Sequence, residues 1–556
     1  MFCCHTFRPS METVLIMLSL LVPGAESILV ITGASTMEDL DESTVERFET
    51  MRNHPIAINC CTKSRLLSCG LFSRYQAASL LDYRSRCGDI LSVTELSAVD
   101  GFGPAYAEAL SGYVSFEGGN TGTSSRVLSQ SLTARSWVRT PGDGTQFCAG
   151  LKYHGEYGDL FEFNWQDRTT YDNPKPGWGC MNAAYYGRTI ALELVAGDFN
   201  ARFGQGLLMW SGTSMSGVSS PRSLVRSGTG ISPSRSFNEG LHGFAAEYSV
   251  SGWTFSAACD RQGLGIAAVN YTGKTLTAGV TGYVSRQRSA ISADWRIGFR
   301  NGAFYGEAAW EGGLPACVAG VLIVPAYGTA LSAALRAYPT GYSGTYSGAV
   351  RSGSRVSDEL GASAAAQNGW GLVTMDAAWH PSKQSFSSRI IAQAERGIPA
   401  GPLDVKAQVR LSERCSISHP GENPGWKHDL RTQLEVSAGE WGLNARAELV
   451  RCEDWAWLWY GELAWAHPYG GSNSVSAWLR VENYCIDNWS DRIYVYERDA
   501  PGNYNVPAYY GRGWNFSLVA SWKSGRHALY FRASSVKREV RLQYTVKFAH
   551  RLRRSA

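Results

Sequence analysis

The residues best suited to chemistry in the first part of the chain form the run Gly101-Phe102-Gly103-Pro104. Two glycines allow a tight turn between helices, and Pro104 can occupy the first position of the second helix. Backbone N–H groups at such a helix start can contact a phosphate group. Lys63 and Arg65, earlier in the same segment, could add positive charge. These residues are therefore a candidate contact site for phosphate, DNA or a protein partner.

The charge of the surrounding segment gives DNA binding little support. Residues 51–116 contain six basic and five acidic residues, a net charge of +1. Affinity for DNA depends on Lys and Arg side chains that displace counterions. Asp100 lies directly before the turn and would repel phosphate. A structural or protein-contact role is therefore favoured over DNA binding.

A second group of polar residues occurs in the middle of the chain, at Asp198, Gln205, Glu239 and His242. They follow or accompany glycines, which permit a bend or a close approach of two backbones. A structural corner inside the lumen of a barrel is the favoured role, and a substrate contact there is the alternative. His154 could approach His242 and Glu239 across such a lumen.

No residue pattern typical of an enzyme occurs. Residues 212–217 lack the spacing of a Gly-x-Ser-x-Gly elbow, and neither a P-loop nor an HExxH motif is present. The ten histidines are dispersed, and the thirteen cysteines include no CxxC pair and no His/Cys cluster at metal spacing. We therefore predict that the chain is not an enzyme, and we assign no catalytic, cofactor-binding or metal-binding residue.

Four cysteines lie close together in the sequence, at Cys60, Cys61, Cys69 and Cys87. They could form a disulfide in an oxidising periplasm or act as small buried hydrophobic residues. The sequence leaves both alternatives open.

The elements that would position these residues follow from hydrophobic periodicity. Residues 403–411 alternate without exception between apolar and polar side chains. A strand directs successive side chains to opposite faces, so this segment predicts a strand with one apolar face. Similar segments recur along most of the chain, among them residues 430–438, 443–449, 493–497 and 540–548. The uncharged residues 314–335 contain prolines and glycines and predict two strands with a turn.

These segments together predict an outer-membrane β-barrel of about 24 to 26 antiparallel strands, with the apolar face towards lipid and the polar face towards the lumen. Trp455, Trp457 and Trp459 share one strand face, as an aromatic belt at a bilayer interface requires. The last predicted strand ends at Phe548, which is similar to the signal that the barrel assembly machinery recognises. A barrel this wide would leak unless it were plugged. We expect the helical segment, or residues 211–238, to occupy or cap the lumen.

The N-terminal part divides into three further segments. Residues 1–27 have the charged, apolar and small-residue regions of a secretory signal peptide. Residues 28–50 are acidic and predict either a linker or a short helix. Residues 51–116 carry apolar residues at helical spacing and predict a compact all-helical domain. Residues 117–556 then form the barrel, so the fold class is mainly β with a small all-α N-terminal domain.

Two motifs indicate a family. The segment 56–116, with its Gly101-Phe102-Gly103 turn, resembles the tandem helix-hairpin-helix domain of competence-type DNA receptors. Residues 197–207, with the pattern Gly-Asp-Phe and Phe-Gly-Gln-Gly-Leu, resemble a family of large Gram-negative outer-membrane barrels that carry such a domain. His242 departs from the Arg that this resemblance would lead us to expect. The resemblance implies an outer-membrane location and architecture, and no activity.

Three functions remain open on the sequence alone. The first is a transport or export barrel whose periplasmic or lumenal helical domain docks a protein partner. The second is a DNA-binding or DNA-uptake component, and the third is a structural or assembly scaffold. In each case the expected partners are the lipid bilayer and the barrel assembly machinery, and no cofactor is expected.

Overall fold

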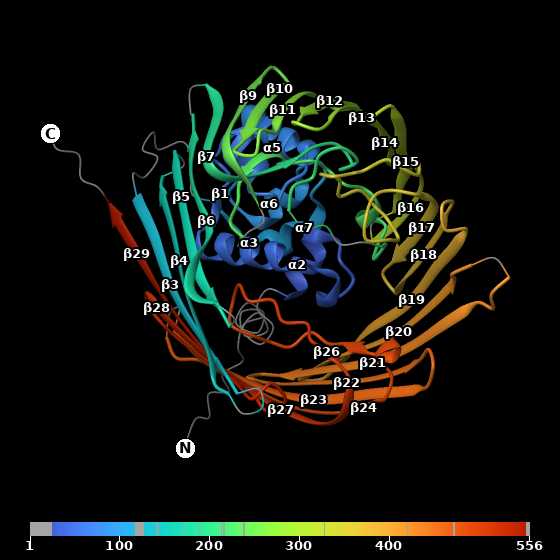
Figure 1. Cartoon of the computed structure of the whole chain (residues 1–556). Helices are drawn as coiled ribbons and strands as arrows, with labels where there is room; N and C mark the ends of the chain where they lie inside the picture. Colours follow the sequence, from blue (N-terminus) through green and yellow to red (C-terminus); the bar gives the residue numbers. More distant parts are fainter. Residues whose placement is uncertain are drawn as a thin grey trace.

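The computed structural model describes residues 25–116 and 127–551, except residues 141, 143, 159, 172, 188–189, 213, 215–216, 237–239, 327, 420 and 471–472. In this part of the chain, 24 strands close into one antiparallel barrel (Figure 1). The prediction of a large antiparallel barrel of 24 to 26 strands is confirmed. The expected signal peptide lies almost entirely outside the described residues.

Residues 25–116 form a helical module, which lies within the ring of strands (Figure 1). Residues 28–50 are part of this module, because α3 crosses the expected boundary at residue 50. The two-residue strands β1 (Ile56–Ala57) and β2 (Val114–Ser115) pair in parallel and join the segment after α3 to the end of the module. Its helices are α2 (Ala25–Thr32), η1 (Met37–Asp39), α3 (Glu42–Asn53), α4 (Lys63–Ser68), α5 (Arg74–Cys87), α6 (Val93–Ala98) and α7 (Gly103–Leu110).

Polar side chains at the helix starts explain where these helices begin. Asp41 accepts a hydrogen bond from the N–H of Thr44 at the start of α3. Ser73 and Gln76 form a reciprocal capping box at the start of α5. Each cap satisfies N–H groups that have no partner within the helix.

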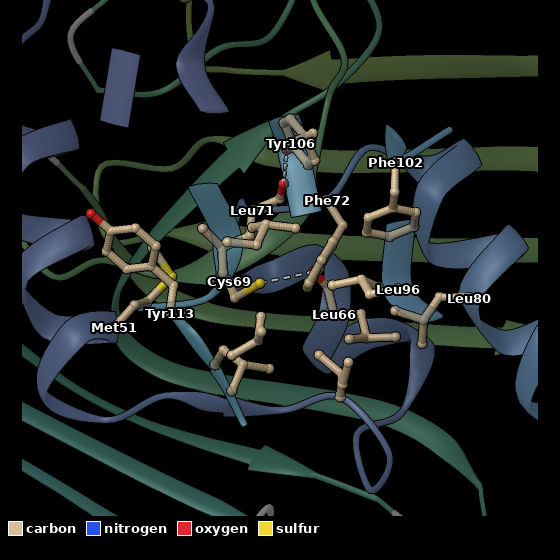
Figure 2. Packing of buried hydrophobic residues seen from close by; sticks show 14 of the residues in the cluster. Met51, Leu66, Cys69, Leu71, Phe72, Leu80, Leu96, Phe102, Tyr106 and Tyr113 are labelled. Atoms are coloured by element: carbon tan, nitrogen blue, oxygen red, sulfur yellow. Dashed lines mark hydrogen bonds between the residues drawn. The ribbon is translucent and has the colours of Figure 1, made fainter. Parts of the chain in front are cut away.

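The module has its own apolar core, which includes Leu66, Phe72 and Leu96 (Figure 2). The hydroxyl of Tyr106 donates a hydrogen bond to the carbonyl of Leu71 within this core, at 2.6 Å. Leu40, Val45 and Phe48 from the acidic segment belong to the same cluster. Leu91, an apolar residue of the segment predicted to be helical, lies outside this core and is 72% exposed. No disulfide joins any two cysteines in the described part of the chain.

The barrel strands follow one another in chain order, and β29 pairs with β3 to close the ring. The short strand β8 (Gly230–Pro233) pairs with the end of β7, which also pairs directly with β9. The 24 strands of the ring are β3 (Val127–Arg139), β4 (Gln146–Tyr157), β5 (Phe161–Thr170), β6 (Asn173–Tyr186), β7 (Ala191–Arg202), β9 (Leu241–Val250), β10 (Trp253–Asp260), β11 (Gly265–Thr272), β12 (Leu276–Val284), β13 (Ser289–Phe299), β14 (Gly302–Glu311), β15 (Leu314–Ala326), β16 (Thr329–Tyr338), β17 (Glu359–Asn368), β18 (Gly371–His380), β19 (Ser385–Ala400), β20 (Leu403–Ile417), β21 (Gly425–Ala438), β22 (Trp441–Arg451), β23 (Trp455–Pro468), β24 (Ser474–Ile486), β27 (Gly511–Ser524), β28 (His527–Ser534) and β29 (Glu539–Arg551).

The outer face of the ring is apolar and the inner face is mostly polar. On β20, Val409 and Leu411 are exposed, whereas Arg410 between them is buried against the contents of the lumen. Trp455, Trp457 and Trp459 are all exposed on the outer face of β23, as the predicted aromatic belt requires. No helix in the described residues is both long enough and apolar enough to span a bilayer.

One predicted strand is wrong. Residues 493–497 alternate like a barrel strand, but only β25 (Ile493–Tyr494) pairs there, with β26 (Ala508–Tyr509). The buried side chains Val495 and Glu497 belong to a segment between β24 and β27 that enters the lumen. This segment, residues 487–510, also contains η3 (Trp489–Asp491). Alternation alone cannot distinguish an inward loop from a strand of the wall.

Two further segments between strands fold inward. The described residues of the segment 203–240, with η2 (Arg222–Leu224) and β8, contact residues 339–358 through the Trp210 N–H, which donates to the Tyr346 carbonyl at 2.7 Å. Arg235 from the first segment pairs with Glu162 on the inner wall. The described residues of both segments that were expected to occupy or cap the lumen contact Glu162 on the inner wall, through Arg65 and Arg235.

If the outer surface of the barrel contacts lipid, a charged substitution should destabilise the protein at an exposed leucine of the barrel wall and not at an exposed leucine of the helical module. Leu411→Arg, near the middle of β20, should destabilise the barrel in lipid vesicles by about 2–4 kcal/mol, because charge is placed in hydrocarbon. Leu91→Arg, on the helical module, should leave stability unchanged. Urea-induced unfolding in vesicles measures both. Equal effects of the two substitutions would contradict a lipid-facing position for β20.

Candidate functional site

The candidate site is the interface between the helical module and the inner wall of the barrel. On one side, Arg65 of α4 pairs with Glu156 of β4 at 2.7 Å and with Glu162 of β5. Glu162 also accepts two hydrogen bonds from Arg235, both at 2.7 Å. Arg65 is 4% exposed and Glu162 is 2% exposed. A buried charge that loses its partner is costly, so these pairs fix the orientation of the module more than they add to stability.

On the opposite side, Glu38 of η1 bonds to Arg446 of β22 at 2.6 Å and approaches Arg431 of β21 at 3.6 Å. It also accepts a hydrogen bond from the backbone N–H of Tyr496 on the inward segment 487–510. Burial alone would raise the pKa of Glu38, but the two guanidinium groups outweigh burial and hold this pKa well below its usual range. Glu38 therefore stays ionised and ties the module to two strands and one loop.

A third contact brings two histidines together. His54, the residue that ends α3, stacks edge-on against His154 of β4, with 4.4 Å between the ring centroids. Burial, followed by the neighbouring His154, lowers the pKa of His54 to about 3. His54, His154 and Glu156 are the one group of three potential metal ligands found among the described residues. The prediction of no metal-binding residues missed this group, because His54 lies far from the other two in sequence.

Two cavities lie between the module and the wall. The larger, about 1010 Å³, is bordered by strands β19 to β24. Basic and acidic side chains are nearly equal in number in its lining, which includes Glu38, Arg446 and Arg480. The smaller, about 570 Å³, has seven arginines and three aspartates in its lining. Burial and the nearby Arg202 lower the pKa of Arg47 in this lining to about 10. The smaller cavity therefore carries a surplus of positive charge and favours anions.

The predicted phosphate or partner contact residues are separated by the fold. Arg65 points into the barrel wall, and Lys63 donates to the hydroxyl of Thr254 on β10 at 3.4 Å. Gly101 and Pro104 are exposed at the turn before α7, whereas Phe102 is buried in the module core. The positive φ angles of Gly101 and Gly103, 87° and 70°, explain why glycine occupies both positions.

The exposed surface of the module is acidic around this turn. Asp100 and Glu108 lie there in exposed positions, and Glu95 is half-buried. The exposed Arg86 is paired with Asp82 within α5. The basic residues Arg65 and Arg74 instead point at the barrel, where Arg74 contacts Asn270 of β11. A phosphate approaching the exposed side of the turn would therefore meet Asp100 and Glu108, whereas Gly101 also borders the arginine-rich cavity.

The predicted lumenal polar group does not form. Asp198 and His242 pair at 3.0 Å, but His242 shares its strand face with the exposed Phe244, so both side chains lie on the outer face. Only Gln205 is buried inside, where its side-chain oxygen accepts from the N–H of Arg226. Glu239 lies outside the described residues. The position of a residue in the alternation of its strand decides the face of its side chain, and Asp198 falls on the same face as the exposed Leu194.

Sequence analysis missed the residues that make the interface. Glu38, Glu162 and Arg446 each occur in segments whose polar residues looked like ordinary solvated positions. Arg65 was singled out, but for contact with phosphate. The one available signal was the alternation that places charged residues such as Arg446 and Glu448 on the inner face of a strand. The partners across the interface are distant in sequence, with 97 residues between Arg65 and Glu162 and 408 between Glu38 and Arg446.

Comparisons with known proteins find matches among solved structures only. No family model and no curated protein matches the chain. Among solved structures, it is similar to OccK2 (OpdF) of Pseudomonas aeruginosa, with 10% identity over 76% of this chain and 98% of that one, and a TM-score of 0.33. The outer membrane protein opdK of the same organism matches with 9% identity over 76% and 99%, and a TM-score of 0.32. OccAB3 of Acinetobacter baumannii matches with 8% identity over 76% and 99%, and a TM-score of 0.28. Likeness this weak supports no statement about function.

The class of protein follows from the structure itself. A closed antiparallel ring satisfies every strand edge, and an apolar exterior around a polar lumen suits a bilayer. Both features are present here. The chain is therefore an outer-membrane β-barrel.

Removal of one buried partner tests the interface on the side of β4 and β5. Arg65→Met should lower the free energy of unfolding by about 3 kcal/mol, because the buried Glu162 and the half-buried Glu156 each lose a cation. Arg512→Met removes the matched exposed pair with Asp487 and should leave the unfolding midpoint unchanged. Urea titration in vesicles measures both. An Arg65→Met midpoint equal to that of the wild type would show that the module is not held there.

The pKa of Glu38 predicts a pH dependence. Because its folded-state pKa lies below the unfolded value, the ionised carboxylate contributes stability that is fully present above the unfolded pKa of about 4.3. That stability is lost as the pH falls below this value, by no more than about 1.4 kcal/mol per pH unit. The unfolding midpoint should therefore fall between pH 5 and pH 3 (roughly) in the wild type, and less steeply in Glu38→Gln. Identical slopes would disprove this role.

Proposed function

We propose that this chain is an outer-membrane transport or export channel whose lumen is closed by its helical module. The observation that carries the proposal is the kind of interface between the two parts. The apolar cluster of the module contains residues of the module itself, with Tyr504 as a partly buried neighbour from the barrel segment. The contacts to the wall are ion pairs and hydrogen bonds, as those of Arg65 and Glu38. A polar interface between separately packed parts permits relative motion.

The two cavities support passage beside the module. Both lie where module and wall meet, so a modest displacement of the module would widen them. The arginine-rich cavity of about 570 Å³ would bind small anionic solutes more strongly than cations. A barrel this wide would let solutes leak through its lumen unless something blocked it. The helical module would block that passage.

The domain organisation forms part of this proposal. Residues 1–27 would be a signal peptide, residues 28–50 an acidic segment built into the plug, residues 51–116 a helix-hairpin-helix domain, and residues 117–556 the barrel. The exposed acidic face of the module would look towards the periplasm and dock a protein partner. Insertion would depend on the barrel assembly machinery, which the aromatic residue Phe548 on the outer face of β29 supports.

DNA binding is the first alternative, with the helix-hairpin-helix turn at residues 101–104 as its contact site. The exposed glycine turn favours it, but Arg65 and Lys63 are turned into the wall and the exposed surface carries Asp100 and Glu108. A scaffold without transport is the second alternative, and the cavities count against it. The channel is therefore the function that the geometry supports best.

A charge reversal at the interface tests the channel. Glu38→Arg places a cation against Arg431 and Arg446, which should displace the module and raise both single-channel conductance in planar bilayers and cellular sensitivity to large antibiotics. Asp487→Arg makes the same reversal against Arg512 at an exposed pair and should change neither quantity.

Two outcomes would count against the channel. If Glu38→Arg folds, as judged by its heat-dependent mobility in gels, and conducts no more than the wild type, the module does not gate the barrel. If Asp487→Arg raises conductance as much as Glu38→Arg, the increase reflects general damage to the barrel. A large increase confined to Glu38→Arg supports the proposal.

A further inference from the structure

Three side chains with metal-binding atoms meet at the interface of module and wall. His154 and Glu156 lie two residues apart on β4 and therefore share its inner face. His54 reaches them from the end of α3. One ligand atom of each residue lies within 4.8 Å of the other two. We propose that His54, His154 and Glu156 bind a Zn²⁺ ion that joins the helical module to the barrel.

The donor set matches zinc. Two imidazole nitrogens and one carboxylate oxygen are ligands that Zn²⁺ accepts, with water in the fourth position. Tetrahedral ligands at about 2.0–2.2 Å from zinc lie about 3.3 Å from one another. His154 Nε2 and Glu156 Oε1 already lie 3.2 Å apart. His54 would have to approach them by no more than about 1.5 Å, which small rotations of the three side chains supply.

Neighbouring polar groups orient both histidines for this role. The Oδ1 atom of Asn164 on β5 lies 2.6 Å from His154 Nδ1, so Nδ1–H can donate to it and leave the Nε2 lone pair facing Glu156. The hydroxyls of Ser129 and Ser131 lie 3.0 Å and 3.1 Å from the two ring nitrogens of His54. Either nitrogen of His54 can therefore bind metal while the other donates to a serine. Metal-binding histidines characteristically have such partners.

The charges around the site are compatible with a dication. Arg65 contacts Glu156 at 2.7 Å, which weakens the attraction of this carboxylate for a metal. Arg65 also pairs with Glu162, however, so its charge is divided between two carboxylates. The carboxylate of Glu156 has enough lone pairs to bind a guanidinium group and a metal ion at the same time. Burial of the site removes competing water and favours a bound ion.

A metal here would link two separately packed parts of the chain. Zinc binding itself does not depend on what the barrel transports. Its consequence rests on the proposed function: a zinc ion bridging α3 and β4 would hold the plug closed, and its removal would loosen one edge of the module.

The test uses the full chain in detergent, stripped with EDTA and titrated with Zn²⁺ by calorimetry, with bound zinc measured by mass spectrometry. The wild type should bind one zinc more per chain than His154→Ala and His54→Ala. Asn164→Ala keeps all three ligands and should bind zinc about 10–100-fold more weakly. His428→Ala is the matched control, because His428 is an exposed histidine beside a single carboxylate, Glu413, and should bind as the wild type does. Co²⁺ in place of Zn²⁺ should give the visible absorption of a tetrahedral site, lost in His154→Ala.

The outcomes separate the site from the function. Equal zinc binding by the wild type and by folded His154→Ala, or no binding by the wild type, would overturn the site. If zinc binds but EDTA leaves single-channel conductance unchanged in a barrel that Glu38→Arg opens, the site stands and its closing role is overturned. If zinc binds and no variant conducts, the proposed channel fails and the metal site survives.

Discussion

The structure depends on one constraint, which is that a backbone in lipid has to satisfy all of its own hydrogen bonds. A sheet achieves this only by closing on itself, so β29 must pair with β3 over the whole length of both strands. Closure with 24 strands creates a lumen too wide for the wall's own side chains to fill. The remaining space is taken by the helical module and by three loops that turn inward. The interior of this protein is thus a consequence of the number of its strands.

The contents of the lumen are attached to the wall in a particular way. The inner faces of the strands are polar, so the module meets guanidinium and carboxylate groups instead of an apolar surface. Such buried pairs confer orientation at little net gain in stability, because desolvation offsets most of the attraction. Arg65 and Glu38 hold opposite sides of the module by this means. A plug held by polar contacts is specific in position and still removable, which suits a channel.

The fold was largely predictable, and the interface was not. Alternation over residues 403–411 and 540–548 predicted wall strands correctly, because period two is a local property that lipid on one side makes obligatory. The same signal failed at residues 493–497, where an inward loop also places alternate side chains against a buried surface. Asp198 and His242 were expected in a lumen but lie on its outside, since Asp198 shares its strand face with the exposed Leu194 and pairs with His242 across the ladder. A shift of one residue in register changes the face of every side chain that follows.

The sequence by itself determined the class of the protein. Short-range patterns of apolar and polar residues predict the strands, their approximate number and the helices of residues 51–116. Only the tertiary structure decided which residues meet. His54 lies 100 residues from His154 in the chain, and Glu38 lies about 400 residues from Arg446, yet each pair is in contact. No local pattern encodes such pairs, because they arise only when the ring closes around the module and its diameter fixes which wall residues the module can reach.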